Sequence, residues 1–94
     1  MTQHRLKAKF PPGCLAATPS ALAKLSPDDA LLALLRHLTG DWGELCACDR
    51  ALNDKALAQG DRLLSAYTSA AGVRFWVVTE ADRSVTTLLL PEEY

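Results

Sequence analysis

The 94-residue chain lacks an apolar run long enough to cross a bilayer, and its first residues lack the apolar core of a signal peptide. It also lacks a basic excess: the formal net charge is −1, which removes the usual electrostatic basis for binding nucleic acid. The cysteine count is three, an odd number, which suits reduced thiols rather than a set of disulfides. These absences predict a cytoplasmic protein with no membrane contact, and they argue against a nucleic-acid partner.

The motifs of common enzymes and metal sites are missing as well. The chain has no phosphate loop, no His-Glu-x-x-His zinc motif, no Cys-x-x-Cys pair and no nucleophile elbow. Cys46 and Cys48 are separated by one residue, whereas structural zinc favours cysteines separated by two to four. Further ligands would have to come from His37, or from Cys14 or His4, which are distant in the sequence. We therefore expect no metal and no cofactor.

What the sequence does contain is a β-rich stretch, Arg62 to Leu90, with three apolar runs separated by turn signals. The middle run, Val73 to Thr79, is apolar on both faces, which is typical of a central strand. The turn signal Ala71-Gly72 predicts a two-residue hairpin loop that places Tyr67 opposite Trp76 on one face. The pattern predicts a three-stranded antiparallel meander.

Short helices are predicted upstream, starting at Thr18-Pro19 and at Ser26-Pro27, because each pair joins a capping hydroxyl to a proline suited to the first helical position. Leucines then recur at helical spacing until Gly40, which predicts a helix over 27–39. Its predicted inward row consists of Leu31, Leu34, Leu35 and Leu38. A further helix is predicted over 47–58, with an inner row of Cys48, Leu52 and Ala56.

These elements together predict an α+β fold. Residues 13–94 would form a single two-layer domain, with the meander in the C-terminal half packed against two to three short N-terminal helices. Cys14 to Ala17 is a candidate short strand. Residues 1–12 are predicted to be a flexible segment, and its cations are typical of a solvated tail. These cations are His4, Arg5, Lys7 and Lys9.

Four strings occur in order along the chain: HLTGDWGEL (37–45), Asn53-Asp54, GDRLLSAY (60–67) and RFWVVTEADRSVTTLLLPEEY (74–94). From about Pro12 onward they resemble a family of small bacterial proteins carried on plasmids and integrative elements. Its members are labelled "plasmid-related protein" or "type I restriction endonuclease subunit M". The resemblance implies a mobile-element origin and an accessory role, such as modulating host defence or restriction.

The restriction label does not fit this chain as an activity. A methylating subunit needs a nucleotide-binding α/β domain with parallel strands. A chain of 94 residues is too short for such a domain, and it has no glycine-rich loop after a strand. Where the family favours acidic residues after Gly-Asp-Trp-Gly, this chain has Cys46 and Cys48, which argues against essential thiols.

Two groups of residues are candidates for chemistry. Asp41 lies four residues after His37, so its carboxylate could orient the imidazole as a catalytic base is oriented. Glu80 and Asp82 share a turn and could add paired acids. The structural alternative is that His37 satisfies carbonyls at the helix end and Asp41 forms an Asx-turn. In that case HLTGDWG is a corner from which Trp42 packs onto the leucine row or onto the sheet.

Three functions therefore remain open. The first is a non-enzymatic protein-interaction protein that docks a sheet face or edge on a partner or on a second copy, with Tyr67, Trp76 and Trp42 as interface candidates. The second is a small hydrolase or nuclease whose catalytic residues would be His37, Asp41, Glu80 and Asp82. The third is a nucleic-acid-binding accessory protein that uses the N-terminal cations with Arg74 and Arg83.

Overall fold

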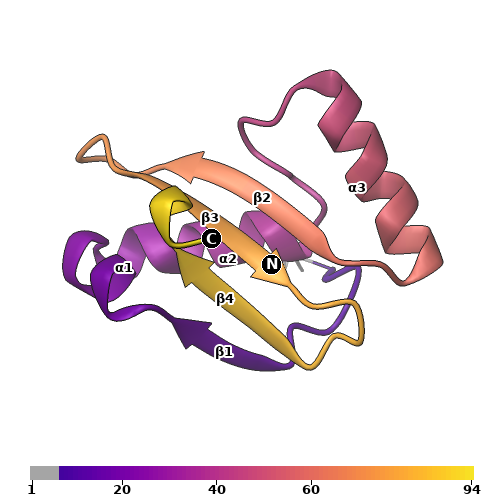
Figure 1. Ribbon diagram of the computed structural model, residues 1–94, viewed down its shortest axis with the longest axis horizontal. Helices are drawn as coiled ribbons and strands as arrows, with labels where there is room; N and C mark the ends of the chain where they lie inside the picture. The colour runs from indigo at the N-terminus through magenta and orange to yellow at the C-terminus, as the bar shows by residue number, and fades with distance from the viewer. Residues whose placement is uncertain (1–6) are drawn as a thin grey trace, which may run out of the picture.

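The structure is a computed structural model, and it describes residues 7–94 (Figure 1). Within these residues a four-stranded sheet is combined with three α-helices and one short 3-10 helix. In chain order the elements are β1 (Cys14–Ala17), α1 (Pro19–Lys24), α2 (Pro27–Leu38), α3 (Ala47–Gln59), β2 (Leu63–Thr68), β3 (Arg74–Thr79), β4 (Val85–Leu89) and η1 (Pro91–Glu93). The predicted α+β class is confirmed.

The sheet has the order β1-β4-β3-β2 and is mixed. β2, β3 and β4 form the predicted antiparallel meander, with β3 between the other two. β1 then adds a fourth strand parallel to β4, with Cys14 beside Val85. The predicted three-stranded sheet was therefore one strand short. Gly13 permits this addition, because a Cβ there would overlap the carbonyl oxygens of Arg83 and Ser84.

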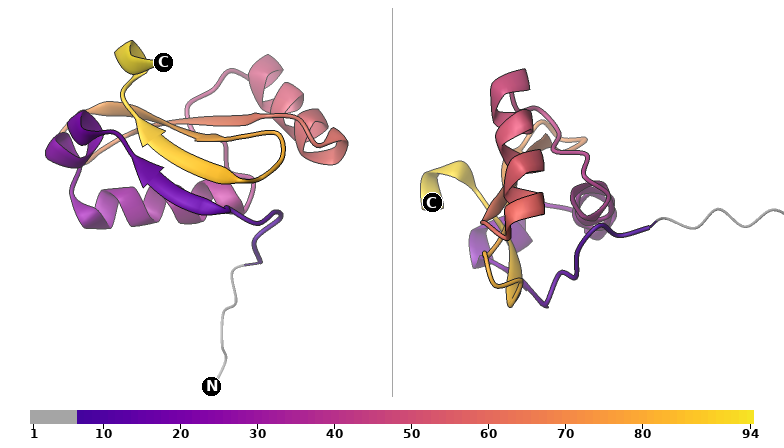
Figure 2. Two further views of the ribbon diagram at one scale, coloured as in Figure 1. Left: turned by 60° about the horizontal axis from the view of Figure 1, so that its bottom comes forward. Right: turned by 90° about the vertical axis from the view of Figure 1, so that its right-hand side faces the viewer.

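The layers are visible in Figure 2: α2 lies on one face of the sheet and η1 on the other. α3 lies alongside β2, at one end of the strand order (Figure 1). The main core forms between α2 and the sheet. Its buried members are Ala33, Tyr67, Phe75, Val77, Leu88 and Leu90.

The helix starts confirm the capping predictions. Thr18 Oγ1 accepts a hydrogen bond from the N–H of Ala21 at 3.2 Å, and Ser26 Oγ accepts from that of Asp29 at 3.1 Å. A proline follows each cap. Downstream, α2 ends at Leu38, close to its predicted end.

The buried side of α2 differs in part from the prediction. Ala33 and His37 are buried, and Leu34 and Leu38 of the predicted row pack against the two cores. Leu31 is 56% exposed and Leu35 is 37% exposed. The face toward the sheet therefore lies to one side of the predicted leucine row. In α3 likewise, Asn53 is buried, while Cys48 and Leu52 of the predicted inner row are exposed.

The β2–β3 hairpin has a different register from the predicted one. Tyr67 pairs with Phe75. The loop comprises the three residues 70–72: the N–H of Ser69 donates to the carbonyl of Val73 at 2.9 Å, and Gly72 adopts φ 85°. A shift of one residue moves a side chain to the other face of the sheet. Tyr67 and Trp76 therefore lie on opposite faces, and the predicted shared aromatic face was wrong.

The segment before β1 is tied to the domain. The N–H of Lys9 donates to the carbonyl of Leu38 at 2.7 Å, and Phe10 is buried against Trp42. His4 and Arg5 of the predicted cationic tail lie outside the described residues.

None of the helices in the described part of the chain combines the length and apolar character needed to cross a membrane.

Candidate functional site

His37 anchors a buried chain of hydrogen bonds rather than an exposed site. Its side chain is 0% exposed in the last turn of α2. Nδ1 lies 2.5 Å from Ser65 Oγ on β2, and Nε2 lies 2.9 Å from Thr79 Oγ1 on β3. Thr79 Oγ1 lies 2.7 Å from Thr86 Oγ1 on β4, and Thr86 donates to the carbonyl of Pro12 at 2.7 Å. The chain joins the helix, three strands and the N-terminal segment.

The direction of every bond in this chain follows from its last acceptor. The carbonyl of Pro12 can only accept, so the hydroxyl of Thr86 donates its hydrogen to that carbonyl. Thr86 must therefore accept the hydrogen bond from Thr79. Thr79 in turn has no proton left for the ring and accepts from Nε2–H of His37. Nδ1 is then the acceptor for the hydroxyl of Ser65. The arrangement satisfies the neutral Nε2–H tautomer.

Burial keeps this imidazole neutral. The rings of Phe10 and Trp42 pack edge-on against His37, with centroids at 5.3 Å and 5.6 Å. Desolvation, aided by the positive charge of Arg83, lowers the pKa of His37 from 6.5 to about 4. The ring is therefore uncharged at neutral pH, and both nitrogens are occupied by protein hydroxyls.

Asp41 does not orient His37. Its carboxylate accepts from Arg36 Nε at 2.7 Å and from the N–H of Gly43 at 3.1 Å. The hydrogen bond from Arg36 lowers the pKa of Asp41 below its ordinary value. The bond to Gly43 is the predicted Asx-turn. The alternative role expected for His37, binding carbonyls at the helix end, is replaced by the buried bonds to β2 and β3.

The two acids of the β3–β4 turn also have separate partners. Glu80 pairs with Arg62 at 3.3 Å, and Asp82 accepts from the N–H of Ser84 at 3.0 Å. Arg83 is held in the same turn by bonds to backbone carbonyls, including that of Asp61 at 2.7 Å. Residues 7–94 contain no group of three or more His, Cys, Asp or Glu side chains placed to hold a metal ion. All three cysteines are exposed and free.

HLTGDWG forms the predicted structural corner. Trp42 is 2% exposed, and its Nε1 donates to Asp54 at 2.9 Å. Gly43 brings the chain against β2, where Ala66 donates to the carbonyl of Trp42 at 3.2 Å and accepts from the N–H of Glu44 at 2.8 Å. Of the three interface candidates, Trp42 and Tyr67 therefore lie in the interior. Trp76 is half-buried against Tyr94 on the far face.

The corner and α3 cover the β2 edge of the sheet. The side-chain amide of Asn53 imitates a neighbouring strand: Nδ2 donates to the carbonyl of Leu64 at 2.7 Å, and Oδ1 accepts from its N–H at 3.1 Å. Together with the bonds made by Ala66, this satisfies peptide groups that an edge strand otherwise leaves unpaired.

The β1 edge differs. The N–H groups of Cys14 and Thr18 donate to β4 at 2.9 and 3.0 Å. Peptide groups alternate in direction along a strand, so those of Leu15 and Ala17 point away from β4. No other segment of the described chain pairs there, and Figure 1 shows β1 at the outer margin of the sheet. Leu15 is 60% exposed. We call this outward side of Cys14–Ala17 the β1 edge.

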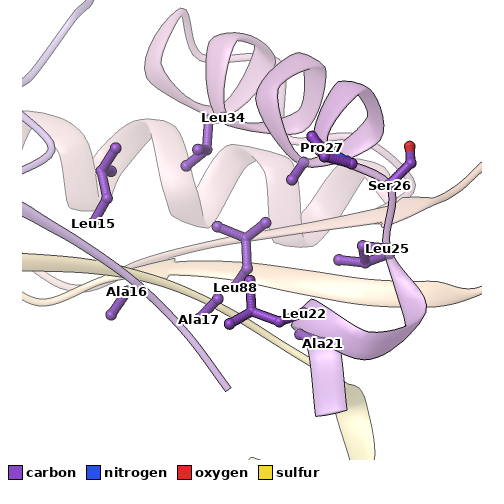
Figure 3. A pocket seen from close by; sticks show the side chains of 11 residues that line it. Leu15, Ala16, Ala17, Ala21, Leu22, Leu25, Ser26, Pro27, Leu34 and Leu88 are labelled. Atoms are coloured by element: carbon purple, nitrogen blue, oxygen red, sulfur yellow. The ribbon is translucent and has the colours of Figure 1, made fainter. Parts of the chain in front are cut away.

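An apolar hollow of about 480 Å³ adjoins the β1 edge. Its walls come from β1, α1, α2 and β4, and Figure 3 shows the side chains of Leu22, Leu34 and Leu88 around it. The lining residues are Leu15, Ala16, Ala17, Ala21, Leu22, Leu25, Ser26, Pro27, Ala30, Leu34 and Leu88. Ser26 is the one residue of this set with a polar side chain, and it caps α2. We call this site the leucine hollow.

Sequence reasoning missed the β1 edge and the leucine hollow. The available signal was the string Cys-Leu-Ala-Ala, which has no charged residue to protect an edge. Comparison of the chain with protein-family models, with curated proteins and with solved structures gives no match.

Proposed function

We propose that this chain is a non-enzymatic protein-interaction domain that docks on a partner through the β1 edge and the leucine hollow. The observation that carries the proposal is the difference between the two edges of one sheet. Asn53 and the corner cover the β2 edge, while the β1 edge is apolar, uncharged and beside a hollow. Strand addition with side chains seated in an adjacent apolar site is a common mode of peptide and protein recognition.

The arrangement of the candidate catalytic residues supports a non-enzymatic role. A general base needs a nitrogen or oxygen within reach of a substrate proton. Both nitrogens of His37 are bound to hydroxyls in the interior. Asp41 and Glu80 are held in ion pairs with arginines. A hydrolase or nuclease built on these residues would require the core to open.

The resemblance to plasmid-borne proteins supports a biological role for this domain. We propose that it is an accessory protein of mobile-element origin that modulates host defence or restriction, with a protein partner or a second copy of itself docked at this site. The net charge of −1 favours a protein partner over nucleic acid. Arg83, one of the cations considered for nucleic-acid binding, donates to backbone carbonyls of its own turn and to that of Asp61.

Site-specific photo-crosslinking tests this function. A photoreactive residue replaces Leu22, 70% exposed at the leucine hollow, or Leu52, 59% exposed on α3, in cells that produce the protein. Discrete protein adducts from position 22 and none from position 52 are expected. Equal adduct formation at the two positions, or no adduct at position 22, would contradict docking through this site.

A further inference from the structure

We propose that the occupant of the β1 edge and the leucine hollow is a second copy of this chain, an inference that rests on the proposed function. Two β1 strands would pair antiparallel about a two-fold axis at Ala16, joining two four-stranded sheets into one continuous sheet. Symmetric dimers bury the same patch on both partners, so the patch must be complementary to itself. Three features of the β1 edge meet this requirement.

The first feature is the position of the free peptide groups. The peptide groups of Leu15 and Ala17 point away from β4, and these two residues are placed symmetrically about Ala16. With the axis at Ala16, Leu15 of one copy lies opposite Ala17 of the other. Residues opposite each other with outward peptide groups exchange both N–H···O bonds, which gives about four hydrogen bonds across the axis. The two Ala16 residues then face each other as a pair that is not hydrogen-bonded.

The second feature is a match between a protruding leucine and the hollow. In the register of the sheet, Leu15 pairs with Thr86 and Ala17 with Leu88, so both face α2. Across the axis, Leu15 of the second copy lies beside Ala17 and points to the same face. It therefore enters the leucine hollow of the first copy next to Leu22. The same contact is repeated on the other side of the axis.

The third feature is the absence of an electrostatic or steric barrier along the strand. Cys14–Ala17 contains no charged residue and no proline, which are common means of preventing edge pairing. Small side chains at Ala16 and Ala17 let the two strands approach. A charge close to the two-fold axis would otherwise lie near the same charge of the second copy and repel it.

The size of the strand shows which side chains must contribute. A standard interface buries about 800 Å² of each partner, and each copy exposes 5863 Å² in total. Pairing over four residues is small beside that standard, and burial of Leu15 and Leu22, 60% and 70% exposed, adds to the area that the dimer covers. The dimer is therefore expected to be reversible and sensitive to a single charge at Leu15.

The first experiment measures the mass of the full chain against concentration by analytical ultracentrifugation. A reversible monomer–dimer equilibrium is expected. Leu15→Lys should raise the dissociation constant by about tenfold to a hundredfold, as expected when one buried leucine is lost from an interface. Leu52→Lys makes the same change at a matched exposure on α3 and should leave the equilibrium unchanged. Circular dichroism confirms that both variants fold.

The second experiment tests the axis. Ala16→Cys is made with Cys14, Cys46 and Cys48 changed to serine. Directly opposed residues in a pair without hydrogen bonds have Cα atoms about 4.5 Å apart, within the range that a disulfide spans. Mild oxidation should therefore give a covalent dimer, whereas Leu52→Cys in the same background should not.

A chain that stays monomeric at all concentrations and gives no Ala16→Cys dimer overturns the second-copy proposal. If photo-crosslinking at Leu22 then yields adducts only with a different protein, docking through the site stands and self-association is excluded. If Leu22 gives no adduct of any kind, the proposed function falls as well. Dimerisation that Leu15→Lys leaves intact would place the interface elsewhere and also overturns the proposal.

Discussion

The burial of His37 makes the stability of this protein depend on pH in a defined direction. In the folded state its pKa is lowered from 6.5 to about 4, chiefly because the charged ring would lose its hydration in the core. The unfolded chain takes up a proton near the ordinary value. Between these two pKa values the unfolded state binds more protons than the folded state. The free energy of unfolding must therefore fall as the pH falls through this window.

The magnitude follows from the two pKa values. Acidification from about pH 7 to about pH 5 should lower the free energy of unfolding by about 2 kcal/mol, and the full loss below about pH 4 should reach about 3 kcal/mol. Such a loss is a large share of the stability of a small domain. The Arg36–Asp41 pair loses its contribution mainly below about pH 4, because its carboxyl pKa is lowered from 3.8. The window above about pH 5 thus reports mainly on the histidine.

Urea unfolding at a series of pH values measures this effect. His37→Gln removes the titration and keeps one polar end for Ser65 or Thr79, so it should be less stable near neutral pH but nearly independent of pH down to about pH 5. His4→Gln removes the other histidine of the chain and should keep the pH dependence of the parent. A His37→Gln variant that retains the parent's pH dependence would refute the reasoning, as would an NMR titration of His37 near its ordinary pKa in the folded protein.

Three further substitutions, and Gly60→Ala as a control for the first, probe the corner and the covered edge by urea unfolding. Gly43→Ala should lower the free energy of unfolding by more than about 3 kcal/mol, because the new Cβ would overlap a β2 carbonyl at a residue with φ 73°. Gly60 has a similar φ of 75° but open space around it, so Gly60→Ala should cost only about 1–2 kcal/mol. Equal costs would contradict this. Trp42→Ala should cost about 3–5 kcal/mol, and a loss under about 1 kcal/mol would show that the corner does not depend on the indole. Asn53→Ala should cost about 1–3 kcal/mol and increase aggregation, because it unpairs Leu64 at the β2 edge. A variant that is as stable and as soluble as the parent would refute that role.

The candidate site divides between what the sequence could predict and what it could not. The Asx-turn at Asp41 follows from residues within one corner, and the burial of Trp42 follows from its large apolar side chain between two glycines, so both were predictable. The partners of His37 were not, because Ser65 and Thr79 are 28 and 42 residues away. A helix-end role would make His37→Ala cost about 1–2 kcal/mol, but the loss of a buried ring and its hydroxyl partners raises the expectation to about 3 kcal/mol or more.

Local chemistry in the sequence determined where elements begin and end. Ser26-Pro27 and Gly40 set the limits of α2, because capping and left-handed turns involve only neighbouring residues. The apolar residues on both faces of the middle run, between two turn signals, likewise determined that β3 is central. Only the tertiary structure decided which side of α2 is buried: that side is centred on Ala33 and His37 and takes only Leu34 and Leu38 from the predicted leucine row.

Tertiary structure also decided the register and the edges. One additional loop residue before Gly72 placed Tyr67 in the core and Trp76 on the far face, a difference that the string Ala71-Gly72 does not encode. The pairing of β1 with β4 joins segments about seventy residues apart, and no local pattern specifies it. The β1 edge and the leucine hollow exist only because that pairing places a short uncharged strand beside α1 and α2.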